Sequence, residues 1–345
     1  MKKALPITTD TCLTSYSFFS NALSILEAGN ASRRSRACID KDETLAPASN
    51  SANEYLPMFC NNFTTLIFGA GRPYVNFIAG VPYGRSVRKH LKHKAVKLER
   101  KDPARFVKER INENRYITVT FNVEYLANIC IDREWYHEYL IYGYDDEAQL
   151  FLAVGYDVDK SCHAFSFRKL EISYGDFLKS LPKRNMKNEL LWIDPEISAE
   201  AINLRKIKRD VFLFAYDILP FIFNAKVYRD FAWVLRLRHG GKKQDANSLR
   251  ASFDMQHFRV LTEHKALMLR MMTELVPGSK AAEEYKSIRN TASLMLMTAL
   301  KYNMRKKNKA KAVDDIRAAL KRLRKDEPLV FRAFYKELKA HEKAK

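Results

Sequence analysis

One histidine and one aspartate stand where a general base and its orienting carboxylate could meet. His137 opens a segment of aromatic and aliphatic residues, and Asp157 closes the next segment of similar pattern. Three segments of period 2, residues 117–123, 137–144 and 149–156, predict an antiparallel β-meander. Antiparallel neighbours joined by a short turn place the start of one strand beside the end of the next. The carboxylate is therefore expected to face the imidazole and orient it.

A structural role is the alternative for this histidine. A lone histidine at a strand start is usually a partly exposed residue or a hydrogen-bonded polar group, and function must be argued from a site rather than from a fold. The other histidines predict no metal site. His264 lies on the packed face of its helix with no second ligand one turn away, and His90 and His93, interpreted as neighbours on a helical face, lie in a basic run that disfavours a bound cation.

The composition is that of a chain with a substantial core and no membrane span. Its 345 residues are 47% hydrophobic, enough for two domains or one large one. No run of 18 apolar residues occurs, and polar threonines follow the basic start, so neither a membrane span nor a secretion signal is expected. The five cysteines are scattered without a C-x-x-C pair, which predicts no zinc site or disulfide framework and a cytoplasmic location.

The positive charge is concentrated in the second half. Residues 201–345 hold 33 Lys and Arg against 15 Asp and Glu, whereas residues 1–200 hold 27 against 25. Eleven of these cations lie between positions 301 and 325. They form either an ordinary solvated surface or a surface that raises the association rate of an acidic partner. Nucleic acid is the rival partner, but its usual motifs are missing and the aromatic residues are not interleaved with the basic ones.

The remaining patterns are mostly helical. Apolar residues predict a helix over 17–27, a long loop over 28–54 and a second apolar helix over 55–68. Further helices are expected over 103–113, after a Ser173 cap, over 260–275, 288–304 and 313–323, and from Asp326-Glu327-Pro328 onward. The sequence thus predicts an α+β chain with a mixed domain over 1–190 and a basic, all-α domain over 200–345.

This order of elements resembles papain-like cysteine-peptidase folds, specifically the C39-like branch. It is more similar to the N-terminal domain of the butirosin-biosynthesis acyltransferase (BtrH-like) family, and to a related group of uncharacterised proteins found beside nonribosomal peptide synthetase genes. Two segments carry the resemblance: His137 with the following Ile141–Glu147 (IYGYDDE), and Phe258–Met271 (FRVLTEHKALMLRM), which contains an L-x-E-H-K pattern. The similarity covers about residues 10–180 and one helix of the second half.

The resemblance implies a role for each candidate residue. His137 matches the general base and Asp157 the carboxylate that orients it. The position of the family's cysteine nucleophile, at the start of the first helix, falls on Ser17, and Cys12 lies a little more than one helical turn upstream. Three possibilities follow: Ser17 is the nucleophile, Cys12 is the nucleophile, or the site is inactive and the fold serves binding. Cys60 lies inside a predicted apolar helix, where cysteines are usually inert.

The function implied is acyl transfer in natural-product assembly. An acyl or peptidyl group would pass from the thioester of an acidic carrier protein to an amine, either a small molecule or a peptidyl group, through an acyl-enzyme and without a metal or cofactor. The alternatives are an inactive papain-like protein that docks an acidic partner, and a nucleic-acid-binding accessory protein. The identities of the acyl donor and amine acceptor, and the oligomeric state, do not follow from the sequence.

Overall fold

The computed structural model describes residues 1–11, 14, 20–28, 66–68, 75–77, 91–99, 101–126, 135–159, 164–183, 188–193, 203–216, 227–232, 235, 252–253, 255–305 and 309–344. The chain divides into two compact units. The first comprises Met1–Glu54 and Tyr83–Ala199, and the second comprises Tyr55–Pro82 and Glu200–Lys345. The second unit thus includes residues 55–82, which the contiguous division expected from the sequence did not assign to it.

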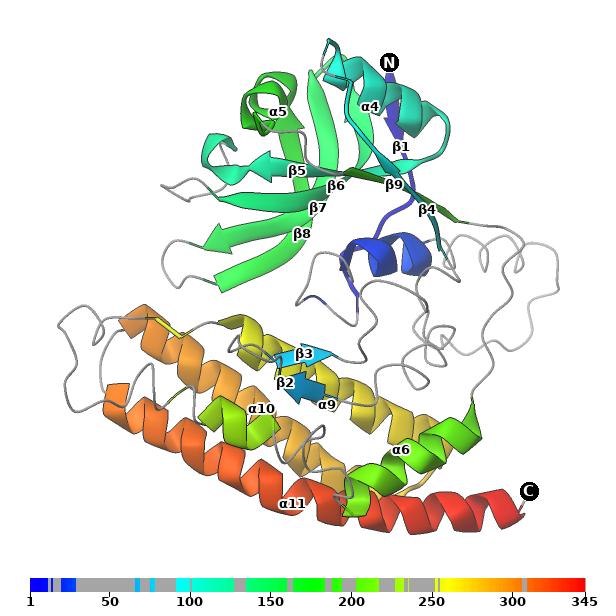
Figure 1. Ribbon diagram of the computed structural model, residues 1–345, viewed down its shortest axis with the longest axis vertical. Coiled ribbons are helices and arrows are strands. Elements are labelled where there is room, and N and C mark those ends of the chain that lie inside the picture. Colours follow the sequence, from blue (N-terminus) through cyan, green and yellow to red (C-terminus); the bar gives the residue numbers. More distant parts are fainter. Residues whose placement is uncertain are drawn as a thin grey trace. The chain divides into compact units, whose positions relative to one another are not determined.

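The first unit is built on one antiparallel sheet, so the protein is of the α+β class. Seven strands take part, in the order β4-β9-β5-β6-β7-β8, with β1 paired to β6 beside this path (Figure 1). Their bounds are β1 Lys2–Ala4, β4 Leu91–Val96, β5 Tyr116–Asn122, β6 Tyr136–Asp145, β7 Leu150–Asp159, β8 Ala164–Ser173 and β9 Asn188–Ile193.

The predicted meander is confirmed as the centre of this sheet. Strand β5 pairs with β6, with Phe121 opposite His137, and β6 pairs with β7, with Leu140 opposite Val154. All seven residues of β5 are buried, because both faces of the strand are covered. The pattern of period 2 therefore located the strands correctly, to within about two residues at most ends.

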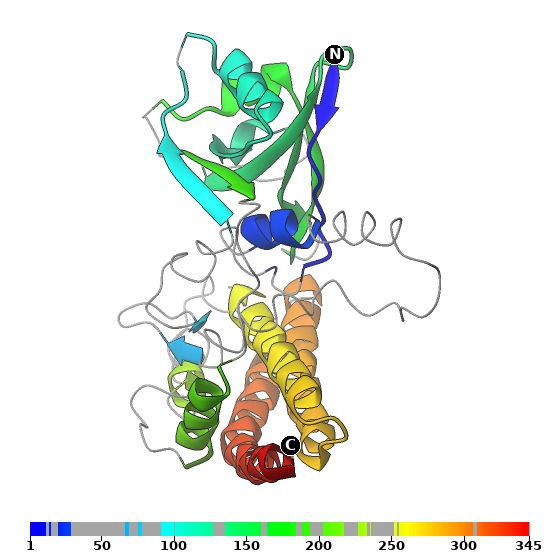
Figure 2. The same ribbon diagram turned by 90° about the vertical axis from the view of Figure 1, so that its right-hand side faces the viewer.

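Helices cover both faces of the sheet. On one face lie α4 (Pro103–Asn112) and α5 (Tyr174–Ser180), and the helical residues 20–28 lie on the other (Figures 1 and 2). The Asp102 side chain caps α4 by accepting from the Arg105 amide at 2.9 Å, and Ser173 caps α5 as predicted. Phe177 of α5 packs edge-on against Phe121 of β5, with ring centroids 5.6 Å apart.

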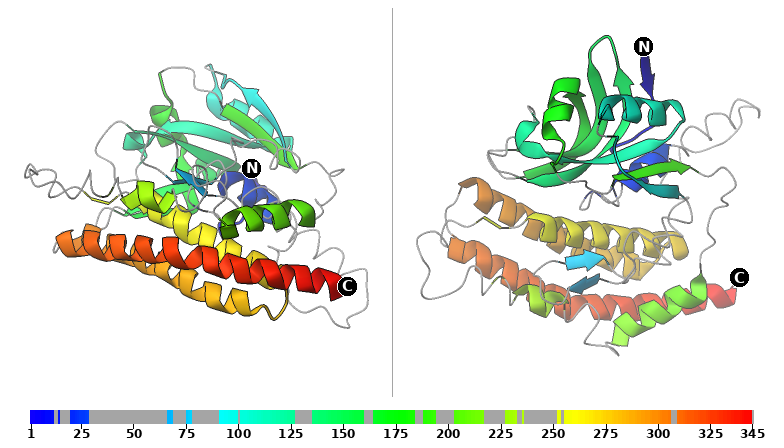
Figure 3. Two further views of the ribbon diagram at one scale, coloured as in Figure 1. Left: turned by 60° about the horizontal axis from the view of Figure 1, so that its bottom comes forward. Right: turned by 45° about the horizontal axis from the view of Figure 1, so that its top comes forward.

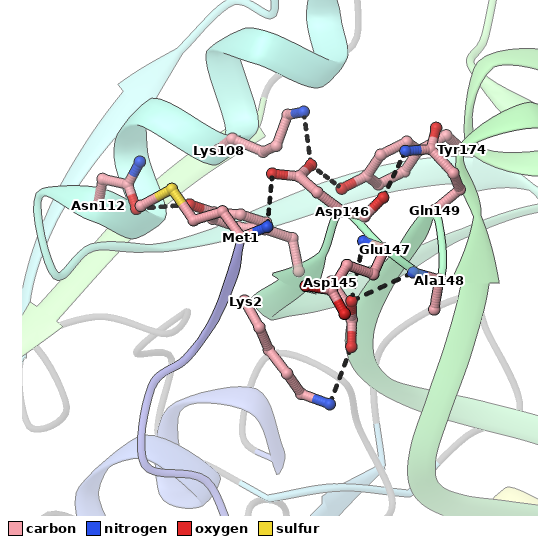
Figure 4. A network of polar contacts seen from close by, with 11 residues as sticks. Met1, Lys2, Lys108, Asn112, Asp145, Asp146, Glu147, Ala148, Gln149 and Tyr174 are labelled. Carbon is pink, nitrogen blue, oxygen red and sulfur yellow. Dashed lines mark hydrogen bonds and ion pairs between the residues drawn. The ribbon is translucent and has the colours of Figure 1, made fainter.

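The acidic turn between β6 and β7 fixes β1 and α4 to the sheet (Figure 4). Lys2 pairs with Asp145 at 2.9 Å, and Lys108 pairs with Asp146 at 2.9 Å. The Tyr174 hydroxyl also donates to Asp146, at 2.9 Å. The carboxylates of Asp145 and Asp146 are therefore engaged in holding the fold together.

A glycine allows β1 to approach β6 closely. A Cβ at Gly143 would lie 2.6 Å from the carbonyl oxygen of Lys3 and 2.9 Å from the Cα of Ala4. Only glycine leaves room for this approach. The ladder between β6 and β7 also shifts register between Ile141 and Gly143, which is a β-bulge at the same place.

Several strands were not predicted from the sequence. Leu91–Val96 forms β4 and pairs with β9, so His93 lies on a strand and the helical spacing assumed for His90 and His93 is wrong. The prediction of one continuous helix over 55–68 is also wrong, since Leu66–Phe68 forms strand β2. It pairs with β3 (Val75–Phe77), and this hairpin belongs to the second unit, which is therefore not all-α.

Helices make up most of the second unit. Its long helices are α6 (Leu204–Tyr216), α9 (Met255–Leu275), α10 (Lys280–Arg305) and α11 (Lys309–Ala344), and Figure 3 shows the last three running alongside one another. Short connections make consecutive helices antiparallel. The stripe predicted over 260–275 is buried as expected, and Gly278 follows it with φ +76°.

The prediction that a separate helix begins at Asp326 is wrong. Helix α11 continues through Pro328, although proline removes one helical hydrogen bond and costs about 3 kcal/mol in a helix interior. Apolar residues on both sides of it, among them Leu323, Val330 and Phe331, are buried. Their packing holds the helix continuous across the proline. Across the described residues, every helix is too short or too polar to cross a membrane.

Candidate functional site

His137 lies near the start of β6 in a wall of aromatic rings. Its ring centroid is 5.0 Å from that of Trp135, 5.2 Å from that of Tyr156 and 6.0 Å from that of Tyr139, all in edge-on geometry. Tyr139 and Tyr156 are buried. The strand therefore holds the imidazole in one orientation, as a positioned base requires.

The surroundings of His137 keep its imidazole neutral. Burial lowers the pKa of His137 below its ordinary 6.5, and a contact with the Glu138 carbonyl oxygen raises it in partial opposition. That oxygen lies 3.1 Å from Nδ1 and can only accept, so Nδ1 carries the proton in the neutral ring. Nε2 is then the unprotonated nitrogen, and no described residue serves as its hydrogen-bond partner. An imidazole in this state can accept a proton at Nε2 at neutral pH.

Asp157 lies on β7, the strand that pairs with β6. The observed pairing of these strands extends to Leu140 opposite Val154, three residues short of His137 and Asp157. The carboxylate of Asp157 forms an ion pair with Arg168 of β8. The Nδ1 contact of His137 is with Glu138 instead. The orienting role of Asp157 therefore remains a prediction.

Gly155 leaves room for the ring of Tyr139. A Cβ at Gly155 would lie 2.1 Å from Cδ1 of Tyr139, so the tyrosine ring lies directly against the glycine. The Tyr139 hydroxyl donates to the Tyr156 carbonyl oxygen at 2.9 Å. The Tyr139 ring is thus held by close packing on Gly155 and by the hydrogen bond of its hydroxyl.

Tyr156 connects His137 to the N-terminal segment. Its hydroxyl donates to the Thr14 carbonyl oxygen and lies 3.1 Å from Oγ of Ser20, at the start of the helical residues 20–28. Ser17 and Cys12 themselves lie outside the described residues, as does Cys60. Thr14 and Ser20 are nevertheless the described residues nearest to Ser17 in sequence, and both bind the tyrosine whose ring touches His137.

The helix that follows buries polar groups without partners. Asn21 and Ser24 are fully buried, and neither side chain has a hydrogen-bond partner among the residues that the structure describes. Buried polar atoms in native proteins are rarely left unsatisfied, and each such atom costs about 1–3 kcal/mol. These two side chains are therefore unusual features of the helix beside the candidate site.

Several residues of this site were not singled out from the sequence. Tyr139 and Tyr156 were predicted only as strand residues. Aromatic residues on the strands around a histidine indicate that its ring is packed among other rings. Burial, with a smaller contribution from Glu189, raises the pKa of Glu138. Nothing in the local pattern predicts that effect, because Glu189 comes from a distant strand.

A second cluster of ionisable residues is buried in the helical unit. The ammonium of Lys265 lies 2.6 Å from Oε1 of Glu327, and both side chains are 0% exposed. The hydroxyls of Tyr285 and Tyr228 donate to Oε1 and Oε2 of Glu327, each at 2.5 Å. Burial lowers the pKa of Lys265, and Glu327 opposes this effect. The sequence feature that could have indicated this cluster is Lys265 itself, which follows Leu261 by four residues and therefore lies on the apolar stripe of its helix.

No metal site is found among the described residues, where no group of three or more His, Cys, Asp or Glu side chains could hold an ion. The chain was also compared with known proteins. No protein-family model matches the sequence, and no curated protein is significantly similar to it.

Proposed function

We propose that the first unit is a papain-like acyltransferase domain acting in natural-product assembly. In this proposal it accepts an acyl or peptidyl group from the thioester of an acidic carrier protein and transfers it to an amine. The observation that carries the proposal is the contact chain from His137 through Tyr156 to Thr14 and Ser20, which bracket Ser17 in sequence. In this series of contacts, the unprotonated Nε2 of His137 is the atom that can accept a proton from a nucleophile.

The proposed reaction has two steps. The Ser17 hydroxyl, or the Cys12 thiol in its place, loses its proton to Nε2 of His137 and attacks the thioester carbonyl carbon. The C–S bond breaks, and the thiol leaves with the proton from His137. An amine then attacks the acyl-enzyme, passes a proton to His137 and forms the amide, and the nucleophile regains its proton. Asp157 would stabilise the imidazolium in both steps.

A second function, binding without catalysis, is favoured by one contact. The carboxylate of Asp157 is ion-paired with Arg168. A carboxylate already neutralised by an arginine stabilises an imidazolium less well. If this ion pair persists when ligands are bound, the domain would act as a docking module for an acidic partner.

Intact-protein mass spectrometry tests the catalytic proposal. The protein is incubated with a panel of acyl thioesters, both carrier-protein-bound and small-molecule, and compared with Ser17→Ala, Cys12→Ala and His137→Ala. His341→Ala, on α11 of the second unit, is the matched histidine control. The proposal predicts an acyl adduct that is lost in His137→Ala and in one of the two nucleophile variants, and retained in the control. An adduct that survives His137→Ala, or no adduct with any thioester, would favour the binding function.

A further inference from the structure

The helical unit contains a basic groove between residues 227–232 and α11. Its volume is about 480 Å³. Among the described residues, four cationic side chains line it, Arg229, Arg317, Lys321 and Arg324, against one carboxylate, that of Asp314. The groove is therefore a concave surface with a strong excess of positive charge, a geometry that concentrates the electrostatic field.

Two of the four cations are available to a partner. Arg229 lies 3.4 Å from Asp230, and Arg317 lies 3.6 Å from Asp314, so each has an acidic neighbour. Lys321 and Arg324 are exposed, and no described acidic side chain pairs with either. Association with an anion would not require breaking an existing ion pair at these two positions.

The spacing of the cations matches one face of a helix. Arg317, Lys321 and Arg324 follow one another at four and three residues along α11, which places them about 6 Å and 4.5 Å apart along the helix axis. Carboxylates at the same spacing on a partner helix lie on a single face. The small side chains of Ala232 and Ala318 also line the groove and leave room for a second helix to approach.

In the part of the chain that the structure describes, the floor of the groove offers no exposed ring for base stacking. Tyr228 lines the groove, but the residue is only 1% exposed. Its hydroxyl is held by Glu327 at 2.5 Å, and its ring lies 5.3 Å from the Lys265 ammonium. Single-stranded nucleic acids bind through exposed aromatic rings as well as cations, and among the described residues Tyr228 is the one aromatic residue that lines this groove. The buried cluster around Glu327 thus holds Tyr228, which lines the groove, in place.

We propose that this groove is the docking site for an acidic amphipathic helix of a partner protein. The partner helix would place carboxylates opposite Arg317, Lys321 and Arg324 and small apolar side chains over Ala232 and Ala318. The inference rests on the proposed function only for the identity of the partner as a carrier protein. The acidity and helical form of the partner follow from the groove itself.

Fluorescence anisotropy with a synthetic probe tests the docking site without any chemistry. The probe is a labelled helical peptide of about 16 residues, long enough for four turns, with glutamates at i, i+4 and i+7. A scrambled peptide of the same composition and an RNA oligonucleotide are the comparison ligands. The groove variant combines Arg317→Glu, Lys321→Glu and Arg324→Glu. The control changes three exposed cations of α11 that do not line the groove, Lys311→Glu, Lys325→Glu and Lys336→Glu.

The proposal predicts that the groove variant binds the peptide about tenfold or more weakly, whereas the control loses less than about twofold. A peptide with lysines in place of the glutamates should regain affinity for the groove variant. Thermal melting checks that each variant is folded, and Lys321→Glu alone replaces the triple change if it is not. Equal losses in both variants, equal affinity for the scrambled peptide, or tighter binding of RNA would overturn the proposal. Because no acyl-enzyme is involved, failure here is distinct from failure of the acyl-transfer function.

Discussion

Each unit packs an ionisable group among other side chains, His137 half-buried and Lys265 fully buried, and the two groups differ in their polar partners. Lys265 is fully buried beside Glu327, which also receives hydrogen bonds from two tyrosine hydroxyls. His137 is surrounded by aromatic rings and has one carbonyl contact at Nδ1. Burial lowers the pKa of both groups, but Glu327 pairs with the charge of Lys265, whereas His137 keeps a ring nitrogen that can accept a proton. The difference separates a structural cluster from a candidate catalytic group.

Breaking the charge pair of the helical unit should have the largest effect. Lys265→Met or Glu327→Gln alone leaves one buried charged or polar group without its partner, and each should destabilise the helical unit by about 3–5 kcal/mol. Urea unfolding followed by far-UV circular dichroism measures this loss. The double variant should lose less than the sum of the single losses, because it leaves no buried unpaired charge. Single losses below about 1 kcal/mol would show that the pair is not buried as described.

Adding a methyl group between Gly155 and Tyr139 should have the next largest effect on stability. In Gly155→Ala the new methyl group would collide with the ring of Tyr139, and overpacking of this kind costs about 1–3 kcal/mol. Gly175→Ala is the matched control, because its nearest neighbour would be Oγ of Ser173 at 3.8 Å. The free energies of unfolding of the two variants are compared with wild type. Equal effects would contradict the close contact between Tyr139 and Gly155.

Protonation of His137 should have the smallest effect on stability. Its pKa is lower in the folded protein than in the unfolded chain, so the unfolded chain binds more protons below about pH 6.5. The contribution to stability is complete above that pH and is lost as the pH falls toward the folded pKa, with a slope of at most about 1.4 kcal/mol per pH unit. His137→Gln should flatten the pH dependence of the free energy of unfolding in this window. An unchanged slope in the variant would contradict the lowered pKa.

Local patterns predicted much of the fold, because period and caps are local properties. The meander, the Ser173 cap and the stripe of α9 follow from residues close in sequence. Strand β4 was missed, because Leu91–Val96 (LKHKAV) is a charged edge strand and only its pairing with β9 makes it a strand. Pro328 was taken as a helix start, because the packing that holds α11 together across it comes from distant residues.

The candidate site was predictable only in part. The positions of His137 and Asp157 on neighbouring strands follow from the meander, but their pairing across the ladder stays a prediction, because the observed pairing ends at Leu140 and Val154. The contacts of Asp157 with Arg168 and of Tyr156 with Thr14 and Ser20 do not follow, because they join segments far apart in the chain. The burial of Lys265 depends on Glu327, which lies 62 positions further along the chain.

The central claim is that His137 is a neutral base whose Nε2 is open to a proton. Nitrogen NMR of the histidine-labelled protein, titrated with pH and assigned with His137→Gln, tests this claim most directly. The account predicts a pKa below 6.5 and a neutral tautomer with the proton on Nδ1. A pKa at or above 6.5, or a neutral ring protonated on Nε2, would contradict it.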